Sequence, residues 1–171
     1  MSNFFIILAA GESKRFNSYI PKPYIVYKGK PIIQHSIDKA QKCKKIDKIL
    51  LVINKKHKKF IKYLNIKKVK IVYGGKTRAE SSYLAMRSIK NKKVKNVFIH
   101  DAARPNFSIK LLKNILKNLK RYRAVIPTIT SRDSIKYKIK NQIFNLNRNN
   151  SILTQTPQGF RFRELYNFAC R

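Results

Sequence analysis

The residues best suited to chemistry in this sequence follow its first apolar run, Phe4 to Leu8. Three small residues come directly after that run: Ala9, Ala10 and Gly11. Two cations follow a little further on, Arg15 and Lys22. Small side chains allow a polyphosphate to approach backbone N–H groups, and the cations can neutralise its charge. The spacing predicts a nucleoside triphosphate site; the alternative is that both cations are merely solvated, as most of the 40 Lys and Arg residues must be.

Asp101 is the most informative acid in a chain with only 7 Asp and Glu residues. It follows the apolar run Val97 to His100 and precedes two alanines, so its carboxylate could accept hydrogen bonds from the hydroxyl groups of a substrate. A salt bridge to one of the many neighbouring cations is the alternative. We expect His100 to be a packed, hydrogen-bonded strand residue, and not an acid or a ligand.

The elements that must position these residues alternate between strand and helix. Five apolar runs have the length of strands: residues 4–8, 49–53, 69–73, 97–100 and 124–127. Apolar residues at helical spacing lie between them, in segments 32–40, 84–89 and 111–116. Continuous apolar strands joined by helices imply a parallel sheet covered on both faces. The sequence predicts an α/β fold, a three-layer sandwich, in one domain spanning residues 1–171.

Three unusual loops each follow one of the predicted strands, so they are expected at the same edge of the sheet. Ligands of parallel sheets bind at this edge, beyond the carboxyl ends of the strands. The loops are LAAG at 8–11, GGKTR at 74–78 and HDAARP at 100–105. Together they predict one pocket. For Gly74 and Gly75 the alternative is a plain turn, and Ser81 or Ser82 could be only the cap of the following helix.

Residues 133–148 have a different pattern, in which apolar and polar positions alternate. The alternation predicts a two-stranded arm with a turn near residues 140–142. Because a lone hairpin is only marginally stable in water, we expect the arm to pair with another subunit.

The formal net charge of +33 would suit a nucleic-acid-binding protein. The lysines are spread over most predicted helices and loops, however, and aromatic residues do not alternate with them as stacking platforms would. A compositional bias at solvated positions is the preferred explanation, so no specific nucleic acid is expected. The charge does predict attraction of small anionic substrates, weakening as salt rises.

Nothing in the sequence predicts a membrane segment or an export signal. No apolar run approaches the roughly 20 residues needed to cross a bilayer, and the N-terminus is not that of a signal or transit peptide. Cys43 and Cys170 form no metal-ligand cluster with the 3 histidines. We therefore expect a cytoplasmic protein with two ordinary thiols and no metal site built from side chains.

Taken together, LAAGESKRF with PK, GGKTRAES, HDAARP, the DS at 133–134, Arg148 and QTPQGF resemble in order and spacing the 2-C-methyl-D-erythritol 4-phosphate cytidylyltransferase family. The resemblance covers essentially the whole chain. It implies a mostly parallel, Rossmann-like nucleotidyltransferase sheet with a protruding β-arm and a homodimer formed through that arm. It also implies that the cytidylyl group of CTP is transferred to 2-C-methyl-D-erythritol 4-phosphate in the non-mevalonate isoprenoid pathway, with release of pyrophosphate and with Mg²⁺ brought by CTP.

The resemblance assigns the nucleotide half of the site. Arg15 and Lys22 match the family's two cationic residues and would stabilise the anionic transition state. Three residues would offer backbone groups to the nucleotide: Ala9, Ala10 and Gly11. Gly75 and Ser81 would lie against the base and ribose.

The substrate half is assigned in the same way. Asp101 would face the methylerythritol chain and the metal–nucleotide region, while Arg104 would touch the substrate phosphate or hold its own loop. Three further residues match positions that hold methylerythritol phosphate, some of them supplied across a dimer interface: Ser134, Arg148 and Thr156.

The chain departs from the family pattern at Ser13, at Pro23 and at Lys76, which stands where an acidic residue is usual near the base. The family also continues past TPQ, whereas this sequence ends at Arg171. We therefore expect a fragment, or a shortened protein lacking the C-terminal end of the family domain. Because some relatives are fused to a cyclodiphosphate synthase, a fused or partner domain of that kind is implied. The alternatives are activation of another polyol phosphate such as ribitol 5-phosphate, a basic nucleic-acid-binding module, or an inactive truncated product.

Overall fold

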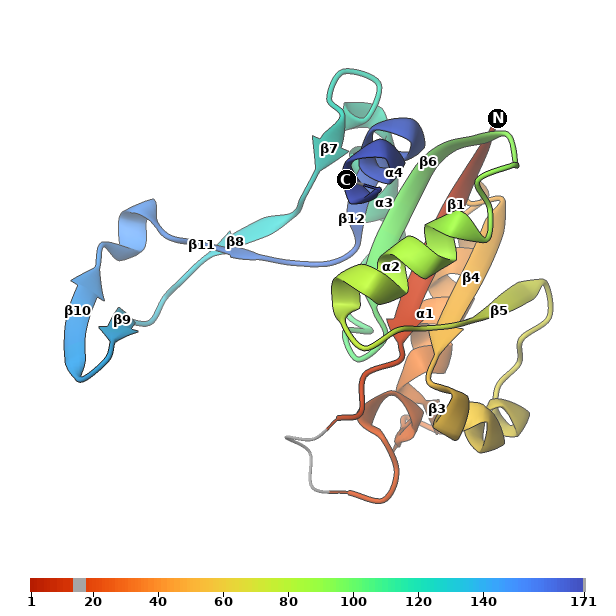
Figure 1. The fold of residues 1–171 in the computed structure, drawn as a ribbon, viewed down its shortest axis with the longest axis horizontal. Coiled ribbons are helices and arrows are strands. Elements are labelled where there is room, and N and C mark those ends of the chain that lie inside the picture. Colours follow the sequence, from red (N-terminus) through yellow and green to blue (C-terminus); the bar gives the residue numbers. More distant parts are fainter. Residues whose placement is uncertain (14–17, 171) are drawn as a thin grey trace.

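The computed structural model describes residues 1–13 and 18–170, and its centre is a six-stranded sheet in the order β5-β4-β1-β6-β12-β7 (Figure 1). The strands are β1 (Ser2–Ala9), β4 (Lys48–Ile53), β5 (Val69–Tyr73), β6 (Val94–Asp101), β7 (Ala124–Val125) and β12 (Gln158–Arg161). β1 pairs in parallel with β4 and β6, and β4 pairs in parallel with β5. All five predicted strands are present, and the predicted mostly parallel sheet is confirmed.

Helices cover both faces of the sheet, as a three-layer sandwich requires. Alternate residues of β1 point to opposite faces, so Phe5 and Ile7 enter one buried cluster and Phe4 and Ile6 enter another. The first cluster is covered by α1 (Ile32–Lys42) and α3 (Ile109–Asn118), and the second by α2 (Arg78–Arg87) and α4 (Phe162–Ala169). The three predicted helices are confirmed; the helical spacing at 84–89 marked only the second half of α2.

The strand β12 was not predicted, because no secondary structure was assigned to QTPQGF from the sequence. It runs antiparallel between β6 and β7, pairing with both. Gly159 at its centre permits this insertion, since a Cβ there would overlap Ile115 Cγ2 of α3. The glycine thus allows α3 to pack directly on the sheet.

The arm of the molecule, residues 128–154, projects away from the body (Figure 1). Its stem is an antiparallel pair of β8 (Thr128–Thr130) and β11 (Ile152–Thr154), and its tip is a hairpin of β9 (Ile135–Ile139) and β10 (Gln142–Leu146). A 3-10 helix, η3 (Arg148–Asn150), leads back to the stem. The predicted hairpin and its turn are confirmed, with Lys140 at a φ of 49° in the turn. The stem was not predicted.

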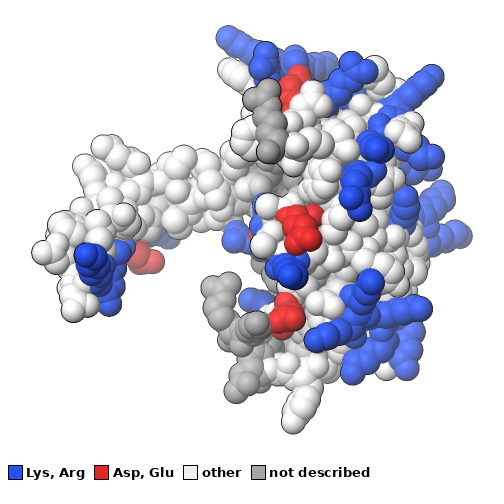
Figure 2. All heavy atoms as spheres, viewed as in Figure 1, with Lys and Arg blue, Asp and Glu red and all other residues white. Residues whose placement is uncertain are grey.

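Short elements complete the connections. A 3-10 helix η1 (Lys22–Tyr24) and the strands β2 (Val26–Tyr27) and β3 (Lys30–Pro31) lead into α1, and η2 (Lys55–Tyr63) joins β4 to β5. Among the residues described, no helix combines the length and apolar character needed to cross a bilayer. On the face drawn in Figure 2, Lys and Arg spread over the body without forming a single stripe.

Candidate functional site

A cavity of about 680 Å³ opens at the carboxyl edge of the parallel strands. It is lined by residues from the three loops that the sequence singled out, which follow β1, β5 and β6. Seven of the predicted site residues line it: Ala9, Ala10, Gly11, Lys22, Gly75, Ser81 and Asp101. The structure thus brings the predicted nucleotide residues and the principal acid together in one place.

The loop after β1 keeps the entrance of the cavity open. Gly11 has no heavy atom within 4 Å of the position that a Cβ would occupy, so a ligand can approach its backbone. Ser13, at a φ of 53°, accepts a hydrogen bond on Oγ from the backbone N–H of Lys22 at 3.2 Å. This bond ties the first loop to η1, where Lys22 contributes to the lining. Arg15, the other predicted cation, lies outside the described residues.

The glycine pair after β5 serves close packing and not a left-handed turn. Neither Gly74 nor Gly75 has a positive φ, so no left-handed backbone conformation requires glycine at either position. A Cβ on Gly74 would overlap Ala10 Cβ and stand 2.7 Å from Ser81 Oγ, and a Cβ on Gly75 would overlap the side chain of Glu80. At position 74 only glycine allows the loop to lie this close to Ala10.

Ser81 and Ser82 are not the cap of α2, which corrects the alternative given above. Thr77 is the N-cap, and its Oγ1 accepts the N–H of Glu80 at 3.0 Å. Ser81 Oγ instead accepts the N–H of Gly75 at 3.1 Å and donates to the Gly75 carbonyl at 3.4 Å. Ser82 donates to the carbonyl of Arg78 at 2.9 Å within the helix. Ser81 therefore shapes the wall of the cavity.

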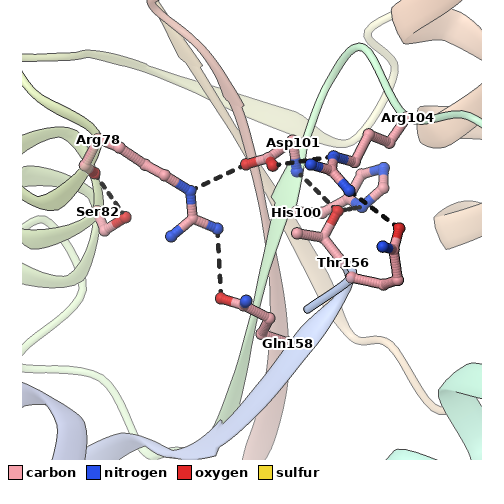
Figure 3. Close-up of polar contacts among 8 residues, drawn as sticks. Arg78, Ser82, His100, Asp101, Arg104, Thr156 and Gln158 are labelled. Carbon is pink, nitrogen blue, oxygen red and sulfur yellow. Dashed lines mark hydrogen bonds and ion pairs between the residues drawn. The ribbon is translucent and has the colours of Figure 1, made fainter. Parts of the chain in front are cut away.

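The carboxylate of Asp101 lies between two guanidinium groups (Figure 3). Arg78 Nε is 3.0 Å from Oδ1, and Arg104 Nε is 3.3 Å from Oδ2. The salt bridge weighed as an alternative for Asp101 is therefore present, twice over. Both oxygens of the one carboxylate are matched by cations, so the three side chains together carry a net positive charge at the edge of the cavity, which favours an anionic ligand.

Two glutamines hold these arginines from β12 and the segment before it. Arg78 Nη2 donates to Gln158 Oε1 at 3.3 Å, and Arg104 Nη1 donates to Gln155 Oε1 at 2.9 Å. Arg78 and both glutamines were not predicted as site residues from the sequence. The GGKTR loop was the available signal for Arg78, and TPQ was the signal for Gln158. Arg104 takes the loop-holding contacts, while its contact with a substrate phosphate stays a prediction.

His100 is confirmed as a packed, hydrogen-bonded residue of the strand. It is fully buried, with Nε2 at 3.1 Å from Ser36 Oγ and Nδ1 at 3.0 Å from Thr156 Oγ1. Burial lowers the pKa of His100 to about 3, so the imidazole is neutral at physiological pH. Thr156 Oγ1 also accepts the N–H of Asp101 at 3.3 Å. The Thr156 hydroxyl thereby fixes the backbone beneath Asp101, and its role in substrate binding stays a prediction.

Ser134 and Arg148 are not brought to this cavity by their own chain. Both are exposed residues of the arm, which extends away from the body (Figure 1). Within residues 1–13 and 18–170 there is also no group of three or more His, Cys, Asp and Glu side chains that could hold a metal ion.

Comparison with known proteins gives a consistent result. The family model described as IspD, 2-C-methyl-D-erythritol 4-phosphate cytidylyltransferase, matches residues 4–170. The chain is 59% identical over 166 residues to a protein of Pelagibacter ubique named "Bifunctional enzyme IspD/IspF", covering 97% of this chain and 45% of that protein. It is 40% identical to the 2-C-methyl-D-erythritol 4-phosphate cytidylyltransferase of Clostridium tetani, covering 96% of this chain and 69% of that one.

A solved structure is similar over nearly the whole fold. The 2-C-methyl-D-erythritol 4-phosphate cytidylyltransferase of Francisella tularensis superposes with a TM-score of 0.83 at 31% identity. The match covers 99% of this chain and 77% of that one. The chain thus spans less than half the length of its bifunctional relative and most of the length of these single-function ones.

Proposed function

Because the chain belongs to the 2-C-methyl-D-erythritol 4-phosphate cytidylyltransferase family, we propose that it transfers the cytidylyl group of CTP to 2-C-methyl-D-erythritol 4-phosphate. The observation that carries the proposal is the cavity itself. It is lined by the small residues at the end of β1, by Gly75 and Ser81, and by Asp101, whose carboxylate forms ion pairs with two arginines. The product would be an isoprenoid precursor, and the second product pyrophosphate.

The reaction requires that the two substrates are positioned and that the negative charge of their phosphates is neutralised. An oxygen of the phosphomonoester attacks the α-phosphorus of CTP, and the bond from that phosphorus to the oxygen bridging the β-phosphorus breaks, so that pyrophosphate leaves. Lys22 lines the cavity as a mobile point charge that can neutralise the phosphates, and we assign Arg15 the same role. No general base is needed, because a phosphomonoester is ionised at neutral pH. This agrees with a neutral, fully engaged His100.

We include Mg²⁺ in the proposal. Mg²⁺ in nucleotide sites is bound mainly through phosphate oxygens and waters, with one or two protein carboxylates. The carboxylate of Asp101 lines the cavity, and each of its oxygens keeps a lone pair beside its arginine contact, so the residues present fit an ion carried by the nucleotide. When bound, the ion supplies positive charge to the phosphate oxygens.

We further propose that the protein works as a homodimer through the arm. The arm exposes apolar side chains that its own chain does not cover: Ile129, Tyr137, Ile139, Ile143, Phe144, Leu146, Ile152 and Leu153. Ser134 and Arg148 stand on the same arm, away from the cavity of their own chain. In a dimer they would reach the cavity of the second copy, where an arginine fork suits a phosphomonoester dianion.

A cyclodiphosphate synthase unit, as a continuation of the polypeptide or as a partner, is also part of the proposal. Its support is the bifunctional name of the Pelagibacter relative. Sequencing the coding region downstream of codon 171 tests the continuation.

A reducing, cytoplasmic compartment is proposed as well, in keeping with Cys43 and Cys170 as free thiols.

Pyrophosphate release from CTP and Mg²⁺, measured against a panel of phosphorylated polyols, tests the activity. We expect release with 2-C-methyl-D-erythritol 4-phosphate and none after chelation of the metal. Release with ribitol 5-phosphate alone would assign a different polyol phosphate. Sedimentation analysis of the same preparation tests the dimer.

A further inference from the structure

We propose that Glu80 is a positioning residue that locks the Gly75–Lys76 peptide, and that this lock sets the affinity for the nucleotide. The proposal rests on the proposed function, because it takes the ligand of the cavity to be CTP. The observation that supports it does not depend on any relative. Glu80 and Ser81, which are consecutive residues of α2, form hydrogen bonds to the two ends of the Gly75–Lys76 peptide.

The carbonyl and the N–H of that peptide are both bound by the first turn of α2. Ser81 Oγ donates to the Gly75 carbonyl at 3.4 Å, and the Lys76 N–H donates to Glu80 Oε2 at 2.7 Å. The Ser81 hydroxyl also accepts the preceding N–H, that of Gly75, at 3.1 Å. A peptide plane held on both sides cannot rotate without breaking a hydrogen bond, one of them to a charged acceptor.

Packing supports the same assignment. The stem of Glu80 lies against Gly75 so closely that a Cβ on the glycine would overlap Glu80 Cγ and Cδ. In a capping box the third helical residue bonds the N–H of the N-cap itself. Here the Glu80 carboxylate reaches past Thr77 to Lys76, so it serves the loop and not only the helix end.

The locked peptide stands at a wall shared by two hollows. Gly75 and Lys76 line the cavity described above, and they also line an adjoining hollow of about 700 Å³ that includes Glu80 itself. The carboxylate thus supports the wall from the side opposite the cavity. A base or ribose resting on Gly75 would meet a surface whose orientation Glu80 has fixed in advance, which saves the ordering cost on binding.

Two substitutions separate the hydrogen bond from the packing. Glu80→Met keeps the length of the stem against Gly75 and removes the acceptor, while Glu80→Gln keeps a neutral acceptor. Glu164→Met is the matched control, because Glu164 is likewise the acidic residue in the first turn of its helix, α4. CTP binding by calorimetry, the kcat and KM for each substrate, and hydrogen exchange over residues 74–81 are measured for all of them.

We expect Glu80→Met to raise the Kd and KM for CTP by about tenfold, with kcat and the KM of the polyol phosphate within about twofold. Hydrogen exchange over residues 74–81 should accelerate by a similar factor. Glu80→Gln should stay within about threefold of the wild type and Glu164→Met should match it. A Kd for Glu80→Met equal to that of the control, a Gln variant as weak as the Met variant, or an equal rise in both KM values would overturn the proposal.

The two proposals fail in different ways. A wild-type protein that binds CTP but releases no pyrophosphate with any polyol phosphate refutes the transfer reaction, and the Kd comparison then still decides the role of Glu80. A wild-type protein that does not bind CTP overturns both.

Discussion

Acidification should destabilise the fold through His100. In the unfolded chain this imidazole takes up a proton near its ordinary pKa of 6.5, whereas burial lowers the folded-state pKa to about 3. Between these two values the unfolded state binds more protons than the folded state, so stability falls as the pH falls. From pH 7 to pH 5 the loss amounts to about 2 kcal/mol for this one residue.

Urea unfolding at the two pH values measures the effect. With a denaturant slope of about 2 kcal/mol/M, the midpoint should drop by about 1 M on account of His100. Burial also lowers the pKa of His57 and adds to the loss with the same sign. Burial acts to raise the pKa of Asp38, but hydrogen bonds to Lys30 and Gln34 together with nearby positive charge lower it overall, and since its ordinary value is 3.8 it acts only at more acidic pH.

A substitution isolates the contribution of His100. His100→Gln keeps hydrogen-bonding capacity toward Ser36 and Thr156 and removes the titrating ring, so its stability should depend less on pH by about 2 kcal/mol over the same interval. Equal pH dependence of the His100 variant and the wild type would refute the argument from burial.

The remaining predictions concern the loops and the arm. Lys22→Ala should lower kcat by at least about tenfold and change the Kd for CTP far less, because its charge is needed most in the transition state; equal losses in both would count against that role. Gly74→Ala should cost about 1–3 kcal/mol in unfolding free energy by denaturant titration, since its Cβ has no room, whereas Gly11→Ala should leave stability unchanged and weaken CTP binding. Ile143→Asp on the arm should convert the proposed dimer to monomers in sedimentation, with the far-UV circular dichroism of the folded chain retained; a dimer that persists would place the interface elsewhere.

Much of the fold could be predicted because its strands are unusually easy to recognise. β1, β4 and β6 are buried on both faces and appear as continuous apolar runs, and the small or charged residues that end them mark the cavity edge. The hairpin of the arm could be predicted because both of its signals are local in sequence: the alternation of apolar and polar residues, and the turn.

The elements that were missed depend on partners distant in sequence. β12 contains Gln158, Gly159 and Arg161, and its identity as a strand comes from pairing with β6 and β7, which no local pattern records. Arg78 was missed because an arginine carries little information in a chain with 40 Lys and Arg residues. Its function becomes visible only when α2 places it beside Asp101.

The insertion of β12 has a mechanical consequence for the arm. The polypeptide leaves the body from β7 and re-enters through β12, which are adjacent strands, so both roots of the arm are fixed about 4.8 Å apart in one sheet. A force that tilts the arm is carried as torque through β12 to β6, the strand that ends at Asp101. In the proposed dimer, contact between the two arms would therefore restrict the motion of the cavity edge in each copy.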